Sequence, residues 1–182
     1  MIEKFRELVK KKNRIFANLE LIQWDLETKT PIKSKPYLAE LVGELSMQEY
    51  DLFTSDEFVN LVETLNKEKN NLSEIEKKEI ELSMEEIEKK KKIPADEYEA
   101  YAKLTSINQG IWEEAKAKND FSIVKDNLEK IFNYNKKFAE YRRKDEKNLY
   151  DVLLNDYEKG MDIEKLDIFF NELKKEIVPF LK

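Results

Sequence analysis

The sequence predicts an all-α protein, a bundle of about seven amphipathic helices. Apolar residues recur at steps of three and four along most of the chain, which is the spacing of one helix face. With 3 Gly and 4 Pro in 182 residues there are few turn-formers for a sheet protein, and no alternating run has the length of a convincing strand. We expect one helical domain over residues 1–182, which is long enough to bury about 70% of its unfolded surface.

The first helix is predicted from Ile2 to about Thr28, and Pro31 and Pro36 interrupt the helical pattern after it. Its inward face carries Phe5, Leu8, Val9, Ile15, Phe16, Leu19, Ile22 and Leu26. Pro36 suits the first turn of a second helix. The inward face of that helix is predicted to carry Leu38, Leu41, Leu45 and Leu52. Gly43 costs this helix about 1 kcal/mol relative to Ala, so we expect a close helix crossing there.

Capping signals define the third and fourth helices. Thr54–Glu57 contains an N-cap followed by a capping-box acid, and Ser73 with Glu76 forms a second capping box. The inward residues are Phe58, Leu61, Val62 and Leu65 in the third helix, and Ile80, Met84 and Ile87 in the fourth. Lys89–Lys92 is interpreted as a solvated run that complements the helix dipole.

Three longer helices and a short one are predicted in the second half. Pro94 starts a helix, Asn119-Asp120 caps the next, a short helix with a loop follows Arg143, and Asp162 caps the last. The inward faces are Tyr98, Tyr101, Leu104, Ile107, Ile111 and Trp112; then Val124, Leu128, Ile131, Phe132, Phe138 and Tyr141; and in the last helix Leu166, Phe169, Phe170, Leu173 and Ile177.

Composition excludes several functions. The chain has 33 basic and 39 acidic residues, a net charge of −6, so nothing favours nucleic acid as a partner. It has no apolar run of about 18 residues and no signal-like segment, so we expect neither membrane insertion nor export. The absence of Cys is compatible with a cytoplasmic location.

The absence of His has the strongest consequence for chemistry. Without His or Cys the chain lacks the usual zinc ligands and the Ser-His and Cys-His nucleophile pairs. Acidic pairs such as Glu40 with Glu44 and Glu85 with Glu88 share helix faces, but we interpret them as solvated surface. We therefore expect no catalytic residue and no metal ligand in this chain, which alone should be inactive.

Several motifs carry family information, because helix formation does not require them. They are YDVLLNDYEKGM at 150–161, LIQWDLETKTP at 21–31, LFTSDE at 52–57, IPA at 93–95, WEEA at 112–115 and KNDF at 118–121. Together, and in the order in which they occur along the chain, they resemble the N-terminal region of the M32 (Taq-type) metallocarboxypeptidases. The sequence departs from the family pattern at Thr30, Lys33, Ser34, Leu38 and Tyr50.

The resemblance implies a function for a longer protein. M32 enzymes are cytoplasmic, all-helical, zincin-type hydrolases, commonly homodimers, that remove C-terminal residues from peptides with broad specificity. They use zinc, sometimes cobalt, held by an HExxH helix and a downstream Glu. This chain has no HExxH, so the resemblance implies a truncated, non-catalytic front domain that forms one wall of the substrate cleft, with the remainder of the peptidase as its partner.

Two other functions remain open: a stand-alone helical module that binds a partner protein or peptide, and the front domain of a related helical oligopeptidase. The candidate cleft or structural residues are Trp24, Asp25, Tyr150, Asp151 and Tyr157. We favour Trp24 as a core anchor with Asp25 satisfying a nearby donor. We favour Tyr150, Asp151 and Tyr157 as hydrogen-bonded locks of their loop.

Overall fold

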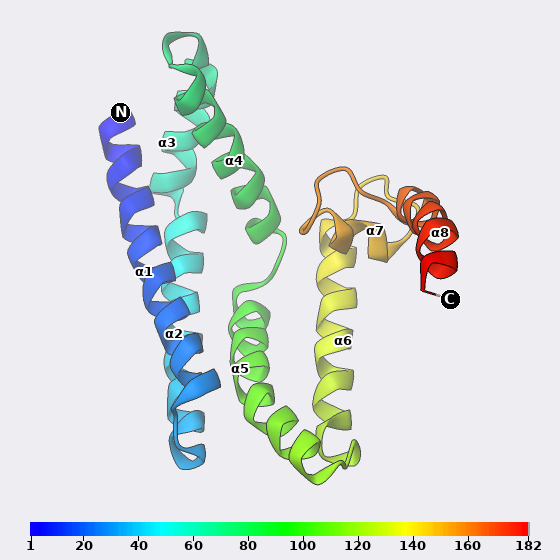
Figure 1. The fold of residues 1–182 in the computed structure, drawn as a ribbon. Helices are drawn as coiled ribbons and strands as arrows, with labels where there is room; N and C mark the ends of the chain where they lie inside the picture. Colours follow the sequence, from blue (N-terminus) through cyan, green and yellow to red (C-terminus); the bar gives the residue numbers. More distant parts are fainter. Residues whose placement is uncertain (182) are drawn as a thin grey trace. The chain divides into compact units, whose positions relative to one another are not determined.

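The computed structural model describes residues 1–181, and these residues form eight α-helices and two short 3₁₀-helices, with no strand (Figure 1). The all-α prediction is confirmed. The α-helices are α1 (Ile2–Thr28), α2 (Lys35–Thr54), α3 (Asp56–Lys67), α4 (Glu74–Lys91), α5 (Ala95–Lys118), α6 (Ser122–Arg142), α7 (Leu149–Leu154) and α8 (Ile163–Phe180). The 3₁₀-helices are η1 (Ile32–Ser34) and η2 (Lys69–Asn71).

The predicted caps are confirmed at the starts of α3, α4 and α8. Ser55 Oγ accepts a hydrogen bond from the Phe58 amide at 3.2 Å, and Ser73 with Glu76 makes the full capping box of α4. Asp162 caps α8 by accepting from the Lys165 amide at 2.8 Å. Asn119 differs from the prediction, because it ends α5 in the left-handed conformation, at φ 51°, instead of starting α6.

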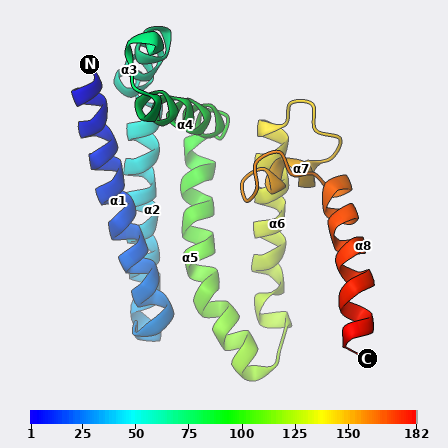
Figure 2. The same cartoon turned by 45° about the horizontal axis from the view of Figure 1, so that its top comes forward.

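Contacts between residues divide the chain into two compact units, Met1–Tyr134 and Asn135–Lys182. In the first unit, α1 runs beside α2, α5 packs along α2, and α3 with α4 forms a hairpin (Figures 1 and 2). The core of this unit lies where α1 and the end of α2 meet α3 and α4. Its buried side chains are Phe5, Phe53, Phe58, Val59, Val62, Leu65, Ile80 and Ile87.

The close crossing predicted at Gly43 is confirmed. Gly43 is buried in α2, and a Cβ atom there would lie 2.5 Å from Cε of Lys103 in α5. The predicted leucine face of α2 is wrong in phase, because Leu38, Leu41, Leu45 and Leu52 are only half-buried. The face turned inward carries the smaller residues Ala39, Val42, Gly43 and Ser46, followed by Glu49 and Phe53. Small side chains let α5 approach the backbone of α2 closely.

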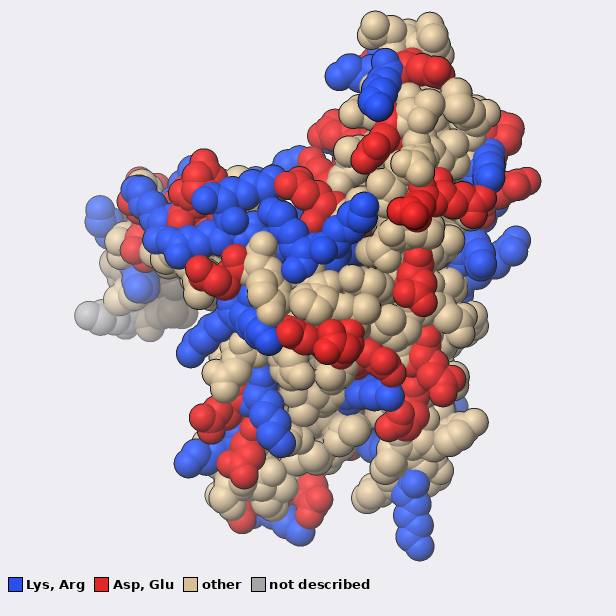
Figure 3. Space-filling model, turned by 180° about the vertical axis from the view of Figure 1, so that it is seen from behind, with Lys and Arg blue, Asp and Glu red and all other residues tan. Residues whose placement is uncertain are grey.

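The second unit contains the end of α6, then α7 and α8. Its buried residues are Phe138, Ala139, Asp151 and Val152, and none lies in α8. The prediction that Phe169, Phe170, Leu173 and Ile177 point into a core is therefore wrong for this chain. No described helix is both long and apolar enough to span a membrane. Figure 3 shows acidic and basic side chains intermixed over one face of the molecule.

Candidate functional site

Trp24 and Asp25 lie in the last turns of α1. The Asp25 carboxylate accepts a hydrogen bond from Thr30 Oγ1 at 2.7 Å, and its carbonyl accepts the amides of Lys29 and Thr30. Asp25 thus satisfies nearby donors and closes the helix, as predicted. Trp24 is 68% exposed, so its interpretation as a core anchor is wrong. The buried residue here is Leu26, two positions and about 200° further round the helix.

Asp151 holds the loop that joins α7 to α8. Its carboxylate is buried and accepts from the Ile163 amide at 3.0 Å and from Asn148 Nδ2 at 2.9 Å. Asn155 accepts the amide of Gly160 at 2.8 Å, and Gly160 has a φ of 81°. Side chains of the motif itself therefore fix the backbone between the two helices.

The two tyrosines of this motif do not lock the loop. Tyr150 is 56% exposed and Tyr157 is 89% exposed, and within residues 1–181 neither hydroxyl makes a hydrogen bond. The prediction is confirmed for Asp151 and wrong for Tyr150 and Tyr157. The loop presents both phenol rings outward on a backbone that Asn148, Asp151 and Asn155 hold in place. Trp24 and Asp25 belong to the first unit and the tyrosine motif to the second.

An apolar groove of about 690 Å³ lies between η1 with the start of α2 and the second half of α5. Ile32, Pro36, Ile107 and Ile111 contribute its apolar walls, and Lys35 forms an ion pair with Glu113 at its edge. A Cβ atom on Gly110 would lie 3.0 Å from Cδ of Lys35, so the glycine leaves room for this lysine to cross α5. Sequence reasoning missed the groove, because its walls come from segments far apart in the chain, as the separation of 78 between Lys35 and Glu113 shows.

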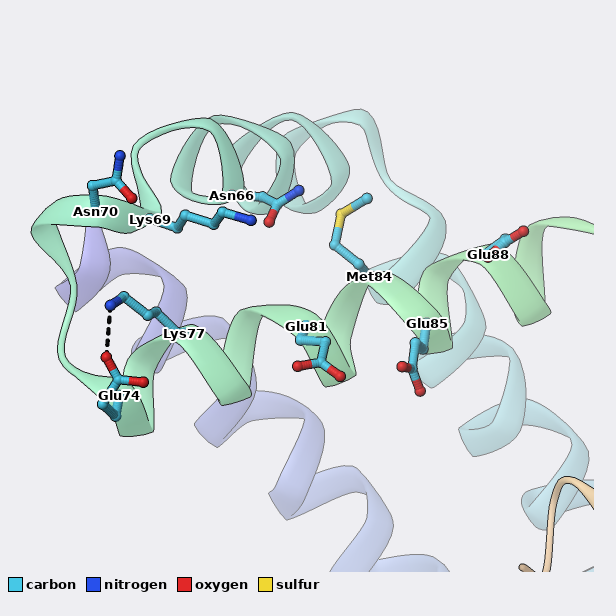
Figure 4. A pocket seen from close by; sticks show the side chains of 9 residues that line it. All are labelled: Asn66, Lys69, Asn70, Glu74, Lys77, Glu81, Met84, Glu85 and Glu88. Carbon is cyan, nitrogen blue, oxygen red and sulfur yellow. Dashed lines mark hydrogen bonds and ion pairs between the residues drawn. The ribbon is translucent and has the colours of Figure 1, made fainter. Parts of the chain in front are cut away.

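A second groove, of about 680 Å³, lies between the end of α3 and α4, and nearly all of its lining residues are polar or charged types (Figure 4). Glu74 and Lys77 form an ion pair of 2.7 Å on the α4 side of it, where Glu81, Glu85 and Glu88 follow along the same helix. Asn66, Lys69 and Asn70 line the facing side. Among residues 1–181 no group of three metal-capable side chains gathers at one point. The residues of the described chain therefore do not fit a catalytic zinc, which needs three protein ligands.

A buried polar cluster joins α2, α4 and α5. Lys90 Nζ donates to Glu49 Oε2 at 3.0 Å and to the Tyr98 hydroxyl at 3.2 Å, and that hydroxyl lies 3.2 Å from the same carboxylate oxygen. Burial disfavours the charged form of Lys90, but Tyr98 and Glu49 outweigh it and raise the lysine pKa. Burial raises the pKa of Tyr98. Lys90 thus stays charged at neutral pH.

This cluster corrects the interpretation of Lys89–Lys92 as a solvated run. Lys90 lies three residues after Ile87, which is itself seven after Ile80, so it continues the buried face of α4. The heptad spacing would have identified it. The cluster links three helices through side chains that are largely buried and bonded to one another, so we interpret it as part of what stabilises the fold.

Comparison with known proteins finds, along nearly the whole chain, the family that the sequence motifs resemble. The sequence model described as Carboxypeptidase Taq (M32) metallopeptidase matches residues 4–182. Carboxypeptidase 1 of Bacillus subtilis (strain 168) is 37% identical over 180 residues, which are 99% of this chain. Thermostable carboxypeptidase 1 of Pyrococcus furiosus is 34% identical over 182 residues. The chain spans about 36% of the length of each of these relatives.

Solved structures agree with the sequence comparison. The crystal structure of BsuCP superimposes with a TM-score of 0.93 at 37% identity, covering 97% of this chain and 35% of that one. The Pyrococcus furiosus carboxypeptidase gives a TM-score of 0.75 at 34% identity, covering 98% of this chain and 36% of that one. The helices described above therefore reproduce about a third of those proteins.

Proposed function

Because this chain belongs to the carboxypeptidase Taq (M32) metallopeptidase family, we propose that it is the N-terminal, non-catalytic helical region of a metal-dependent carboxypeptidase. The observation that carries the proposal is the family match from residue 4 to 182 in a chain with no His and no Cys. The chain matches the family along its length, and its residues supply no HExxH zinc site.

The substrate of the complete enzyme is a peptide with a free C-terminus, and zinc or cobalt supplies the activated water when bound. This chain contributes exclusion and positioning, as one wall of the substrate cleft. The apolar groove beside Lys35 and the exposed rings of Trp24, Tyr150 and Tyr157 are surfaces suited to hold an extended peptide. Holding a substrate near attack geometry contributes to rate even without a reacting group. The proposal includes a cytoplasmic location and a homodimeric complete enzyme, as the family resemblance implies.

A chimera tests the proposal. This chain replaces the matched region of Bacillus subtilis Carboxypeptidase 1, and release of C-terminal residues from peptides is measured with zinc or cobalt and with EDTA. We expect the chimera to be active and EDTA-sensitive and the isolated chain to be inactive. Activity of the isolated chain, or a folded chimera with none, contradicts the proposal. Reading the gene in frame beyond Lys182 for an HExxH motif tests the same point independently.

The exposed apolar residues of α8 favour the second candidate, a helical module that binds a partner protein. This alternative predicts a stop codon after residue 182 and a saturable partner. The third candidate, a helical oligopeptidase region, predicts that the complete protein cleaves peptides with blocked C-termini. A carboxypeptidase needs the free carboxylate and leaves such peptides intact.

A further inference from the structure

One face of α8 is apolar along its whole length. Leu166, Phe169, Phe170, Leu173, Ile177 and Phe180 follow one another at helical spacing and form a single stripe. Phe169 is 57% exposed, Phe170 46% and Ile177 43%. The other side of the helix carries Glu172 and Lys175, both exposed. A stripe of this kind is the pattern of a helix that packs against something.

The comparisons indicate what covers this stripe. The match to the Pyrococcus furiosus carboxypeptidase covers 98% of this chain, so nearly all of α8 belongs to the shared part. In each relative, the part outside the match is nearly twice as long as the part inside it, since the match covers about 36% of the relative. Within residues 1–181 the stripe is exposed, and the part of each relative outside the match is long enough to cover it.

A second copy of this helix is a poorer cover. An 18-residue helix is about 27 Å long and about 10 Å across. Pairing one such stripe with itself gives a contact well below the roughly 800 Å² per partner of a standard interface. The stripe suits a larger surface that wraps the helix, as within a single domain.

We propose that the apolar stripe of α8 binds the catalytic part of an M32 carboxypeptidase, the polypeptide region that the relatives have outside this match. The inference rests on the proposed function and extends it by naming the partner and the surface. Aromatic residues such as Phe169 and Phe170 are enriched in the buried centre of such contacts.

Single cysteines test the docking surface directly, because the chain contains none. Ile177→Cys places a thiol on the stripe, and Glu172→Cys is the matched control on the opposite side of the same helix. Each variant is prepared in the full 182-residue chain and in the chimera with Bacillus subtilis Carboxypeptidase 1. Labelling by a thiol reagent is timed, and the labelled residue is identified by peptide mass spectrometry.

We expect Cys labelling in Ile177→Cys to slow by at least about tenfold from the isolated chain to the chimera, because a buried thiol reacts only after local opening. Labelling in Glu172→Cys should change by less than about twofold. Equal labelling of Ile177→Cys in both proteins overturns the inference. Protection that already exists in the isolated chain and rises with concentration also overturns it, since the occupant is then a second copy.

Peptidase activity separates this inference from the proposed function. A chimera with a protected stripe and no activity supports the docking surface and contradicts the carboxypeptidase role. An active chimera with a freely labelled stripe supports the carboxypeptidase role and contradicts the docking surface. Ile177→Glu provides a second measurement. It should leave the far-ultraviolet circular dichroism of the isolated chain unchanged, since the side chain is exposed there, and should make the chimera sensitive to proteases.

Discussion

At the scale of single residues, the cluster of Glu49, Lys90 and Tyr98 is a place where one substitution should be costly. Glu49 is 6% exposed and Lys90 is its ion-pair partner at 3.0 Å. Lys90→Met removes the cation and leaves a buried carboxylate without its countercharge. We expect the free energy of unfolding to fall by about 3 kcal/mol, as is typical when one member of a buried pair is removed. Urea unfolding followed by circular dichroism measures it.

Lys91→Met is the matched control, because Lys91 is the exposed neighbour on α4. It should change the free energy of unfolding by less than about 0.5 kcal/mol. Replacing both partners, Glu49→Gln with Lys90→Met, should recover part of the loss, since no buried charge then remains. Equal effects of Lys90→Met and Lys91→Met would show that the cluster contributes no stability.

The same residues make stability depend on alkaline pH. The pKa of Lys90 is raised from 10.5 and that of Tyr98 from 10.0. A group whose folded pKa is raised contributes stability below its unfolded pKa and loses it as pH rises through the folded value. The urea midpoint should therefore hold up to about pH 10 and fall above it, less steeply in Lys90→Met than in the natural chain. Parallel titrations of both proteins would refute this assignment.

At the scale of helices, the crossing of α2 and α5 depends on Gly43. Lys103 of α5 lies over this glycine and forms ion pairs with Glu40 at 2.8 Å and Glu99 at 3.0 Å. Gly43→Ala gains about 1 kcal/mol of helix propensity. It also forces a Cβ to within 2.6 Å of Lys103 Cγ, so the lysine must leave its position. We expect net destabilisation of about 1 kcal/mol, in the range for overpacking.

Removing the lysine should reverse the sign. In a Lys103→Ala background the space above Gly43 is open, and Gly43→Ala should then stabilise by up to about 1 kcal/mol. Thermal and urea unfolding of the four proteins in this double-mutant cycle give the coupling energy. If Gly43→Ala has the same effect in both backgrounds, the close approach of Lys103 does not explain the glycine.

Helix existence and ends could be predicted from the sequence because their causes are local. Ser73 caps α4 through a residue only three positions away, and Asp162 does the same for α8. Burial could not be predicted as well, because it depends on which neighbour covers a face. The leucines of α2 and the small residues beside them both fit a helical period, and the approach of α5 decided between them. Asp151 was predictable as a lock, whereas exposed Trp24 and Tyr157 were not.

At the scale of the whole molecule, the two units differ in how much they bury. Met1–Tyr134 contains the cluster of Phe5, Phe53, Phe58 and their neighbours. In the second unit the buried side chains are confined to α6 and α7, and α8 has none among the described residues. Regions with few buried contacts open at low free energy, so the units should not be equally stable. The folded state of the first unit rests on its own core, whereas α8 relies on the Asp162 cap and the Asp151 bond.

Limited proteolysis of the isolated chain should reveal this difference. Lys and Arg number 33 and occur in every long helix, so trypsin meets sites throughout the chain and local opening decides which are cut. We expect the first cuts after residue 142, including Lys174 and Lys175 of α8, and a resistant fragment containing Met1–Tyr134. Lys10 and Lys11 are also exposed but lie on α1, which packs against the core, and should be cut later. Mass spectrometry of the early fragments decides the order.

Cleavage at Lys10 or Lys11 before cleavage in α8 would mean that the buried phenylalanine cluster does not determine which of the two units is the more stable.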